Sequence, residues 1–151
     1  MHNEDVISHL NTLIETSKDG EYGFQTSAES LRNPELKRLF MSRALECREA
    51  ASELQALVRQ LGGEPDDSGT LAGAMHRGWV AVRTTLASYS DKVILEEAER
   101  GEDSALARYR KVAEEEDLPM NVRIIVERQL AGVKENHAQI RSLRDQARAT
   151  A

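Results

Sequence analysis

Apolar residues recur along most of the chain at alternating steps of three and four residues, the spacing of a helix that buries one face. In the first such run they include Val6, Leu10 and Leu13 and continue to Leu31. The spacing predicts long helices at about residues 4–31, 34–61, 91–116 and 119–148, with a shorter helix at about 70–87. No segment has the strict alternation of a strand. The sequence therefore predicts an all-α fold.

Helix-capping residues support these boundaries. Asn33 precedes a proline and is a good N-cap, and we expect Asn3 and Ser90 to cap two other helices, each followed by acidic residues that suit the helix dipole. Gly62 follows the second helix, where glycine can adopt the left-handed conformation that ends a helix. The breaks coincide with the three prolines of the chain, Pro34, Pro65 and Pro119.

The lengths of the connections predict how the helices pair. The first two long helices are separated by about two residues and the last two are similarly close, so each pair is expected to form an antiparallel hairpin. Nearly thirty residues with their own short helix lie between the pairs, about enough to travel the length of a bundle. This organisation is typical of a four-helix bundle with one long crossover connection. We expect residues 1–151 to form a single domain of this kind.

Charged residues lie where the apolar stripes should face the bundle interior. Glu102 and His137 fall on the central stripes of their helices, and Glu21, Glu46 and Glu99 fall on or beside them. Counted from the first predicted turn at about 1.5 Å per residue, Glu21 and Glu46 differ in height by roughly 3 Å. Glu99, Glu102 and His137 share a second layer by the same count. An unpaired carboxylate buried there would cost several kcal/mol, so these groups need compensation.

Two interpretations of this polar layer are open. In the first, Glu21, Glu46, Glu99, Glu102 and His137 bind a metal ion such as iron, manganese or zinc, as carboxylates and histidines do in di-iron bundles. In the second, Arg43, Lys134 and His137 neutralise the four carboxylates without a metal. Glu49 stands where the di-iron pattern requires histidine, and Lys134 stands where it requires a carboxylate. The first interpretation therefore favours a single or weakly held ion.

Composition and charge exclude several classes of protein. The formal charge is −6 and no basic block is present, so a nucleic-acid partner has no electrostatic driving force. A single cysteine excludes disulfide frameworks and cysteine-rich metal motifs. No run approaches the ~18 apolar residues of a membrane span, and the start has no signal-peptide pattern. We expect a cytoplasmic protein without a membrane partner.

Five segments together resemble a bacterial family of unknown function with a ferritin-like four-helix bundle. They occur in order along nearly the whole chain: Asp19-Gly20-Glu21-Tyr22-Gly23-Phe24, Leu61-Gly62-Gly63-Glu64-Pro65, His76-Arg77-Gly78-Trp79, Glu99-Arg100-Gly101-Glu102-Asp103 and Lys134-Glu135-Asn136-His137. The resemblance implies a ferritin-like fold but no established reaction. Carried over from ferritins and rubrerythrins, it places metal ligands at Glu21, Glu46, Glu99, Glu102 and His137. Ferritin-like bundles often pair, so the resemblance leaves a homodimer open.

Three functional hypotheses follow from the sequence. The leading one is a metal-binding bundle without established catalysis. Its rival is a stress-associated structural or interaction protein, in which the polar layer is an ion-pair network that fixes the register of the helices. A di-iron oxidase agrees least well with Glu49 and Lys134.

Overall fold

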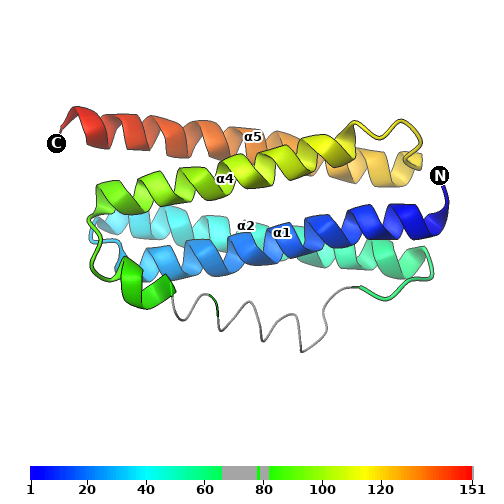
Figure 1. Cartoon of the computed structure of the whole chain (residues 1–151), viewed down its shortest axis with the longest axis horizontal. Coiled ribbons are helices and arrows are strands. Elements are labelled where there is room, and N and C mark those ends of the chain that lie inside the picture. Colours follow the sequence, from blue (N-terminus) through cyan, green and yellow to red (C-terminus); the bar gives the residue numbers. More distant parts are fainter. Residues whose placement is uncertain (66–77, 79–81, 151) are drawn as a thin grey trace.

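The computed structural model describes residues 1–65, 78 and 82–150, and these residues contain helices and no strand (Figure 1). The long helices are α1 (Asn3–Ser30), α2 (Pro34–Gln60), α4 (Asp91–Ala113) and α5 (Met120–Ala149). This confirms the predicted all-α fold, and the bounds of α1, α2 and α5 lie within one residue of those expected. Within this described part of the chain, no helix is both long and apolar enough to cross a bilayer.

The helices form two antiparallel hairpins that pack side by side. α1 packs along α2, α4 packs along α5, and α1 also contacts α4. α2 ends and α4 begins at opposite ends of the bundle, as a long crossover requires (Figure 1). The short helix expected at 70–87 falls largely outside the described residues, but residues 82–86 within it are helical. The topology is that of a ferritin-like four-helix bundle.

Side-chain caps fix several helix ends as the sequence predicted. The Asn33 side chain accepts hydrogen bonds from the backbone of Glu35 at 2.8 Å and Leu36 at 3.3 Å. Ser90 accepts one from Val93 at 3.4 Å, and Gly62 has a φ of 82°. These contacts satisfy backbone groups that helix ends leave unpaired.

Two helix ends differ from the expectation. Asn3 is the first residue of α1 rather than its cap, and the preceding His2 makes no side-chain capping bond; acidic residues in the first turn favour the helix dipole instead. α4 ends at Ala113 rather than at 116. The acidic residues that follow are unfavourable at a helix C-terminus, and Arg123 of α5 donates to the carbonyl of Ala113 at 3.1 Å.

The apolar core consists of two clusters separated along the bundle. One cluster lies toward the start of α1 and the other toward its end, where the rings of Phe24 and Phe40 meet edge to face with centroids 5.3 Å apart. The first cluster includes Leu10, Leu13, Leu54, Val58, Val122 and Val126, and the second includes Phe24, Leu31, Phe40, Ile94 and Ile140. The charged residues of interest lie between the two clusters.

Candidate metal site and mid-bundle cavity

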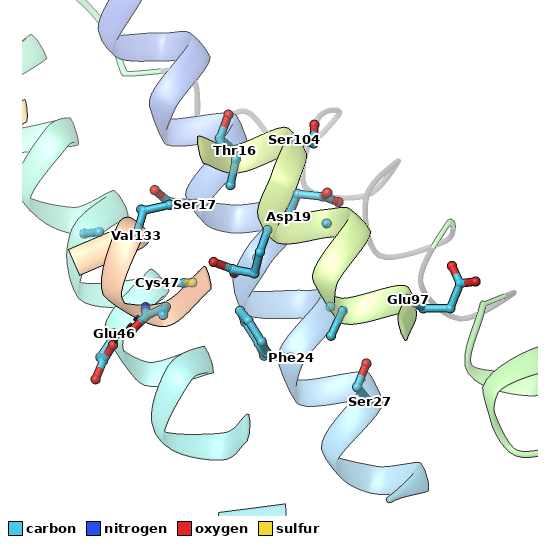
Figure 2. A pocket seen from close by; sticks show the side chains of 18 of the residues that line it. Thr16, Ser17, Asp19, Phe24, Ser27, Glu46, Cys47, Glu97, Ser104 and Val133 are labelled. Carbon is cyan, nitrogen blue, oxygen red and sulfur yellow. Dashed lines mark hydrogen bonds between the residues drawn. The ribbon is translucent and has the colours of Figure 1, made fainter. Parts of the chain in front are cut away.

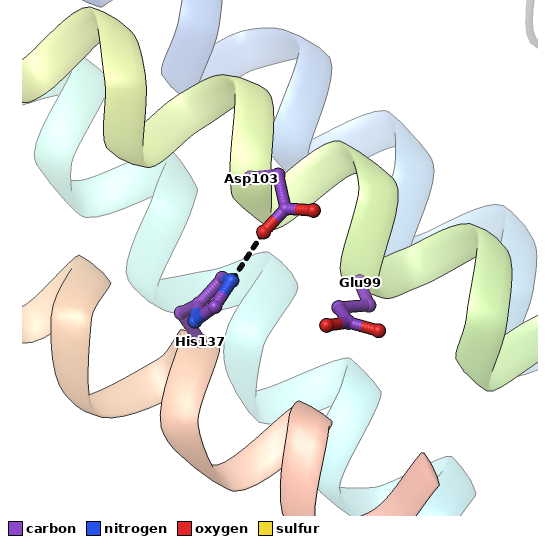
Figure 3. Close-up of side chains that lie close together, drawn as sticks. All are labelled: Glu99, Asp103 and His137. Atoms are coloured by element: carbon purple, nitrogen blue, oxygen red, sulfur yellow. Dashed lines mark hydrogen bonds and ion pairs between the residues drawn. The ribbon is translucent and has the colours of Figure 1, made fainter.

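Glu99, Asp103 and His137 converge between α4 and α5 (Figure 3). Each offers one potential ligand atom, and these atoms all lie within 4.8 Å of one another. In the described part of the chain they form the one group of three or more His, Cys, Asp or Glu side chains with this spacing. The arrangement can present one nitrogen and two oxygens to a cation.

Helix geometry explains how this group forms. Glu99 and Asp103 are four residues apart on α4, so their side chains lie on the same face, one turn apart. His137 approaches from α5, and its Nε2 contacts a carboxylate oxygen of Asp103 (Figure 3). The histidine side chain is 16% exposed and that of Asp103 is 61% exposed, so the group extends from the interior to the surface.

A guanidinium group competes for one of these carboxylates. Arg144, seven residues after His137 on α5, forms an ion pair with Glu99, and the two side chains are only 14% and 12% exposed. Such a pair has little access to solvent, so removal of either partner would leave a charge without compensation. Glu99 is therefore neutralised by Arg144 when no other cation is bound.

Glu102 lies one position before Asp103 but belongs to a different environment. It is 7% exposed, and burial raises its pKa from 4.5 to about 7. His137 and Arg43 oppose this rise in pKa, while Asp103 and Glu46 add to it. In the described residues no group forms a hydrogen bond or ion pair with its carboxyl group. Glu102 is consequently a buried carboxyl group without a direct partner among the described residues.

Cys47 of α2 lies near the remaining predicted carboxylates. Burial, together with the nearby charges of Glu102, Glu46 and Glu21, raises the pKa of its thiol to about 12. The thiol is thus protonated at neutral pH, as is typical of a cysteine in apolar surroundings. A Cβ atom on Gly20 would lie 2.9 Å from the Cys47 sulfur, so glycine is needed for this close approach of α1 to α2.

Arg43 neutralises Glu46, as the metal-free interpretation predicted. Its Nη1 donates to the two Glu46 oxygens at 3.1 and 2.8 Å, and its Nη2 donates to the side-chain oxygen of Gln139. Its Nε is buried without a hydrogen-bond partner among the described residues. Lys134, the other cation expected in this role, is exposed. The cation that pairs with Glu99 is Arg144.

A cavity of about 620 Å³ occupies the space between the two apolar clusters (Figure 2). Figure 2 shows Ser17 and Phe24 of α1, Cys47 of α2 and Val133 of α5 around this space. Glu102 also lines it, whereas Glu99, Asp103 and His137 do not. The cavity and the candidate metal group are thus separate features of one layer.

A hydrogen-bonded chain closes the end of the cavity toward the first apolar cluster. The Tyr109 hydroxyl lies 2.8 Å from Gln129 Oε1, to which it donates, and 3.0 Å from the Ser17 hydroxyl. Gln129 in turn donates to Glu53 at 2.8 Å. Burial raises the pKa of Tyr109 to about 12, so its hydroxyl keeps its proton. This network of four residues connects all four long helices.

The sequence prediction located the layer but divided its members differently. The structure brings Glu99 and His137 together, as expected, and adds Asp103, which the stripe analysis missed although its four-residue spacing from Glu99 was visible. Glu21, Glu46 and Glu102 lie around Cys47 instead. Arg144 was also missed, and its signal was the two-turn spacing from His137.

Comparisons with known proteins place the fold. A family model described as Domain of unknown function (DUF2383) matches residues 5–115. The solved structure of the bacterioferritin-related protein from Bacteroides fragilis, described as a dodecameric thioferritin, is similar to this structure with a TM-score of 0.78. The two sequences are 18% identical. The match covers 99% of this chain and 90% of that one, and it shows a ferritin-like fold. No curated protein matches.

Proposed function

Because the chain belongs to the Domain of unknown function (DUF2383) family and folds as a ferritin-like bundle, we propose that it binds a divalent metal ion through Glu99, Asp103 and His137. The observation that carries the proposal is the convergence of the three ligand atoms within 4.8 Å of one another. Two carboxylates and an imidazole suit iron(II), manganese(II) or zinc(II).

The environment of the three residues supports an ion at this place. His137 and Glu99 come from facing helices and are mostly buried, so their positions are fixed by the packing of the bundle. The more exposed Asp103 gives the group contact with solvent, from which an ion can enter. A bound ion of this kind would supply Lewis-acid chemistry, and iron or manganese would also supply redox chemistry.

The proposal is narrower than the ligand set predicted from the sequence. It keeps Glu99 and His137, adds Asp103, and treats Glu21, Glu46 and Glu102 as neighbours of Cys47. Their role as ligands stays a prediction, which the metal content of Glu21→Gln, Glu46→Gln and Glu102→Gln variants tests directly. One group of three ligand residues supports a single ion rather than a di-iron pair.

The Arg144–Glu99 ion pair favours a second candidate function. In a metal-free structural or interaction protein, Arg144 and Arg43 would neutralise the layer permanently and fix the register of the helices. Both candidates use the same carboxylates, so the decisive difference is whether a metal ion displaces Arg144 from Glu99.

Metal analysis of the purified protein tests the proposal. The chain is produced with added iron, manganese and zinc, purified without chelator and measured by mass spectrometry of its metals. We expect a stoichiometric ion in the wild type and its loss in Asp103→Asn and His137→Ala. Glu135→Gln is the matched control, because Glu135 is an exposed acid two positions from His137. Wild-type protein without a stoichiometric ion, or variants that retain it, would overturn the proposal.

We also propose that copies of the chain associate. Met41 and Leu45 form an exposed apolar pair one turn apart on α2, at 49% and 55% exposure, and Met120 and Ile124 form another on α5. Large apolar side chains in such pairs are typical of contact surfaces. The similar Bacteroides fragilis protein is dodecameric. Light scattering should give at least a dimer, and a monomer at micromolar concentration would contradict this proposal.

A further inference from the structure

Small residues are frequent in the middle of the bundle. Where the two apolar clusters would otherwise meet, the helices carry small residues: Ser17, Gly20, Ala50, Ala98, Gly101 and Gly132. Native cores are close-packed, and voids larger than a water molecule are few. A cavity of about 620 Å³ lies within the size range of sites that hold small organic molecules.

The glycines at 101 and 132 are not explained by close packing of the helices that the structure describes. Gly20 is explained by the nearby Cys47 sulfur, but a Cβ atom at Gly101 or Gly132 would meet no atom of the described residues within 4 Å. Both glycines lie inside helices, where glycine is less favourable than alanine by about 1 kcal/mol. Residues that lower helix stability without allowing a close contact are expected where the space itself has a use.

A buried carboxyl group that has no partner in the part of the chain the structure describes faces this space. Glu102 lines the cavity, is 7% exposed and has no hydrogen bond or ion pair with any described residue. The nearby cations are engaged elsewhere: Arg43 binds Glu46 and Gln139, and His137 contacts Asp103. Buried polar groups are normally paired, so the carboxyl group is available to a ligand.

The charged residues around the cavity determine which ligand charge is favourable. Its described lining has one basic side chain, Arg108, and four acidic ones, Asp19, Glu46, Glu97 and Glu102. The rest of the wall is mainly apolar, with Phe24, Leu86 and Val133 among its residues. This lining would repel an organic anion. A cation with an apolar body, in contrast, matches both the acidic side chains and the apolar wall.

We propose that the mid-bundle cavity binds a small apolar organic amine, whose hydrocarbon part packs against Phe24, Leu86 and Val133 and whose ammonium group pairs with Glu102. A charge-assisted hydrogen bond to a carboxyl group as buried as that of Glu102 is among the strongest polar contacts available to a ligand. The site is independent of the metal proposed at Glu99, Asp103 and His137, because none of these three residues lines the cavity.

Three naphthalene compounds of similar size test the proposal, with naphthalene fluorescence and calorimetry as readouts. The full chain is titrated in chelator-treated buffer, without metal, with naphthylethylamine, naphthylethanol and naphthylacetate. We expect the amine to bind about tenfold more tightly than the alcohol, and the acetate to be the weakest. Equal affinities for amine and alcohol, or no binding of the amine at millimolar concentration, would overturn the proposal.

Two variants locate the binding. Glu102→Gln keeps the shape of the side chain and should lower amine affinity about tenfold while leaving alcohol affinity unchanged. Gly132→Leu should fill the cavity and abolish binding of both compounds, whereas Ala131→Leu on the exposed face of the same helix should bind as wild type does. Unchanged amine binding in both Glu102→Gln and Gly132→Leu would contradict this site. Thermal unfolding confirms that each variant is folded before it is titrated.

Discussion

The two sides of the mid-bundle layer hold buried carboxyl groups that are compensated in different ways. Between α4 and α5, Glu99 is paired with Arg144 and lies beside Asp103 and His137. On the cavity side, Glu102 is equally buried but has no partner in the described residues, and its pKa rises to about 7. The two glutamates are three residues apart on the same helix. The direction of a side chain from α4, more than its depth, therefore decides its chemistry.

This difference separates two kinds of binding. Glu99 already pairs with a cation, the Arg144 guanidinium, and a metal ion can take the place of that guanidinium. A carboxyl group that has no partner in the described residues and lines a cavity can instead receive a molecule that fills the cavity. A substitution can therefore alter one side of the layer and leave the other unchanged.

The largest effect is expected from loss of the Arg144 charge. Because breaking a buried pair leaves an uncompensated charge, Arg144→Leu should lower the free energy of unfolding by about 3 kcal/mol in the absence of metal. Manganese at a hundredfold excess over its dissociation constant should then restore about 2.7 kcal/mol, since the ion takes the place of the guanidinium. Urea denaturation with and without manganese measures both quantities.

The exposed Arg100, which pairs with Glu97 on the outside of α4, is the control for this experiment. Its side chain is 73% exposed, so Arg100→Leu should change stability by less than about 1 kcal/mol. Unaltered stability of Arg144→Leu would show that the pair does not neutralise Glu99. Loss of stability without recovery in manganese would contradict the proposed ion.

The next effect is a pH dependence on the cavity side. The folded protein holds the Glu102 proton up to about pH 7, whereas the unfolded chain releases it near 4.5. The folded state therefore binds more protons within this window, and the free energy of unfolding falls as pH rises through it. The loss should reach about 3 kcal/mol above pH 7. Glu102→Gln should remove it and be more stable than wild type at alkaline pH.

Urea denaturation from about pH 5 to pH 8 in chelator-treated buffer follows this effect, because each curve gives the free energy of unfolding at one pH. Glu97→Gln is the matched variant, since Glu97 is exposed on the same helix. A wild type and a Glu102→Gln variant with parallel pH profiles would mean that Glu102 is not the group responsible.

The smallest effect contrasts two glycines that line the cavity. Gly132→Ala should raise the free energy of unfolding by about 1 kcal/mol, because alanine favours the helix and its Cβ meets no atom of the described residues within 4 Å. Gly20→Ala should lower it by about 1 kcal/mol or more, because its Cβ would lie 2.9 Å from the Cys47 sulfur. Thermal unfolding of the two variants gives the comparison. Equal shifts of the same sign would contradict the described packing.

The fold could be predicted from the sequence because its determinants are local. Asn33, Ser90 and Gly62 act where the sequence placed them, and the spacing of residues such as Leu10, Leu13 and Leu54 identified the buried faces. The end of α4 was expected at 116, just before Asp117 and Pro119, but the helix ends at Ala113, because the acidic residues that follow oppose the helix dipole.

The site could be predicted only in part because depth along a helix does not fix lateral direction. Counting residues from the turns correctly placed Glu99 and His137 at one level. It could not show that Glu102 faces the cavity while Asp103 turns toward α5, because that depends on how the two hairpins dock. The ion pair between Arg144 and Glu99 could not be predicted for the same reason, since the two residues lie on different helices.

Crystals grown with manganese test the proposed metal site most directly. Anomalous scattering locates the ion without any assumption about its ligands. We expect a peak within coordinating distance of Glu99, Asp103 and His137, with the Arg144 guanidinium displaced from Glu99. A peak among Glu21, Glu46 and Glu102, or no peak beside His137 while Arg144 still pairs with Glu99, would contradict it.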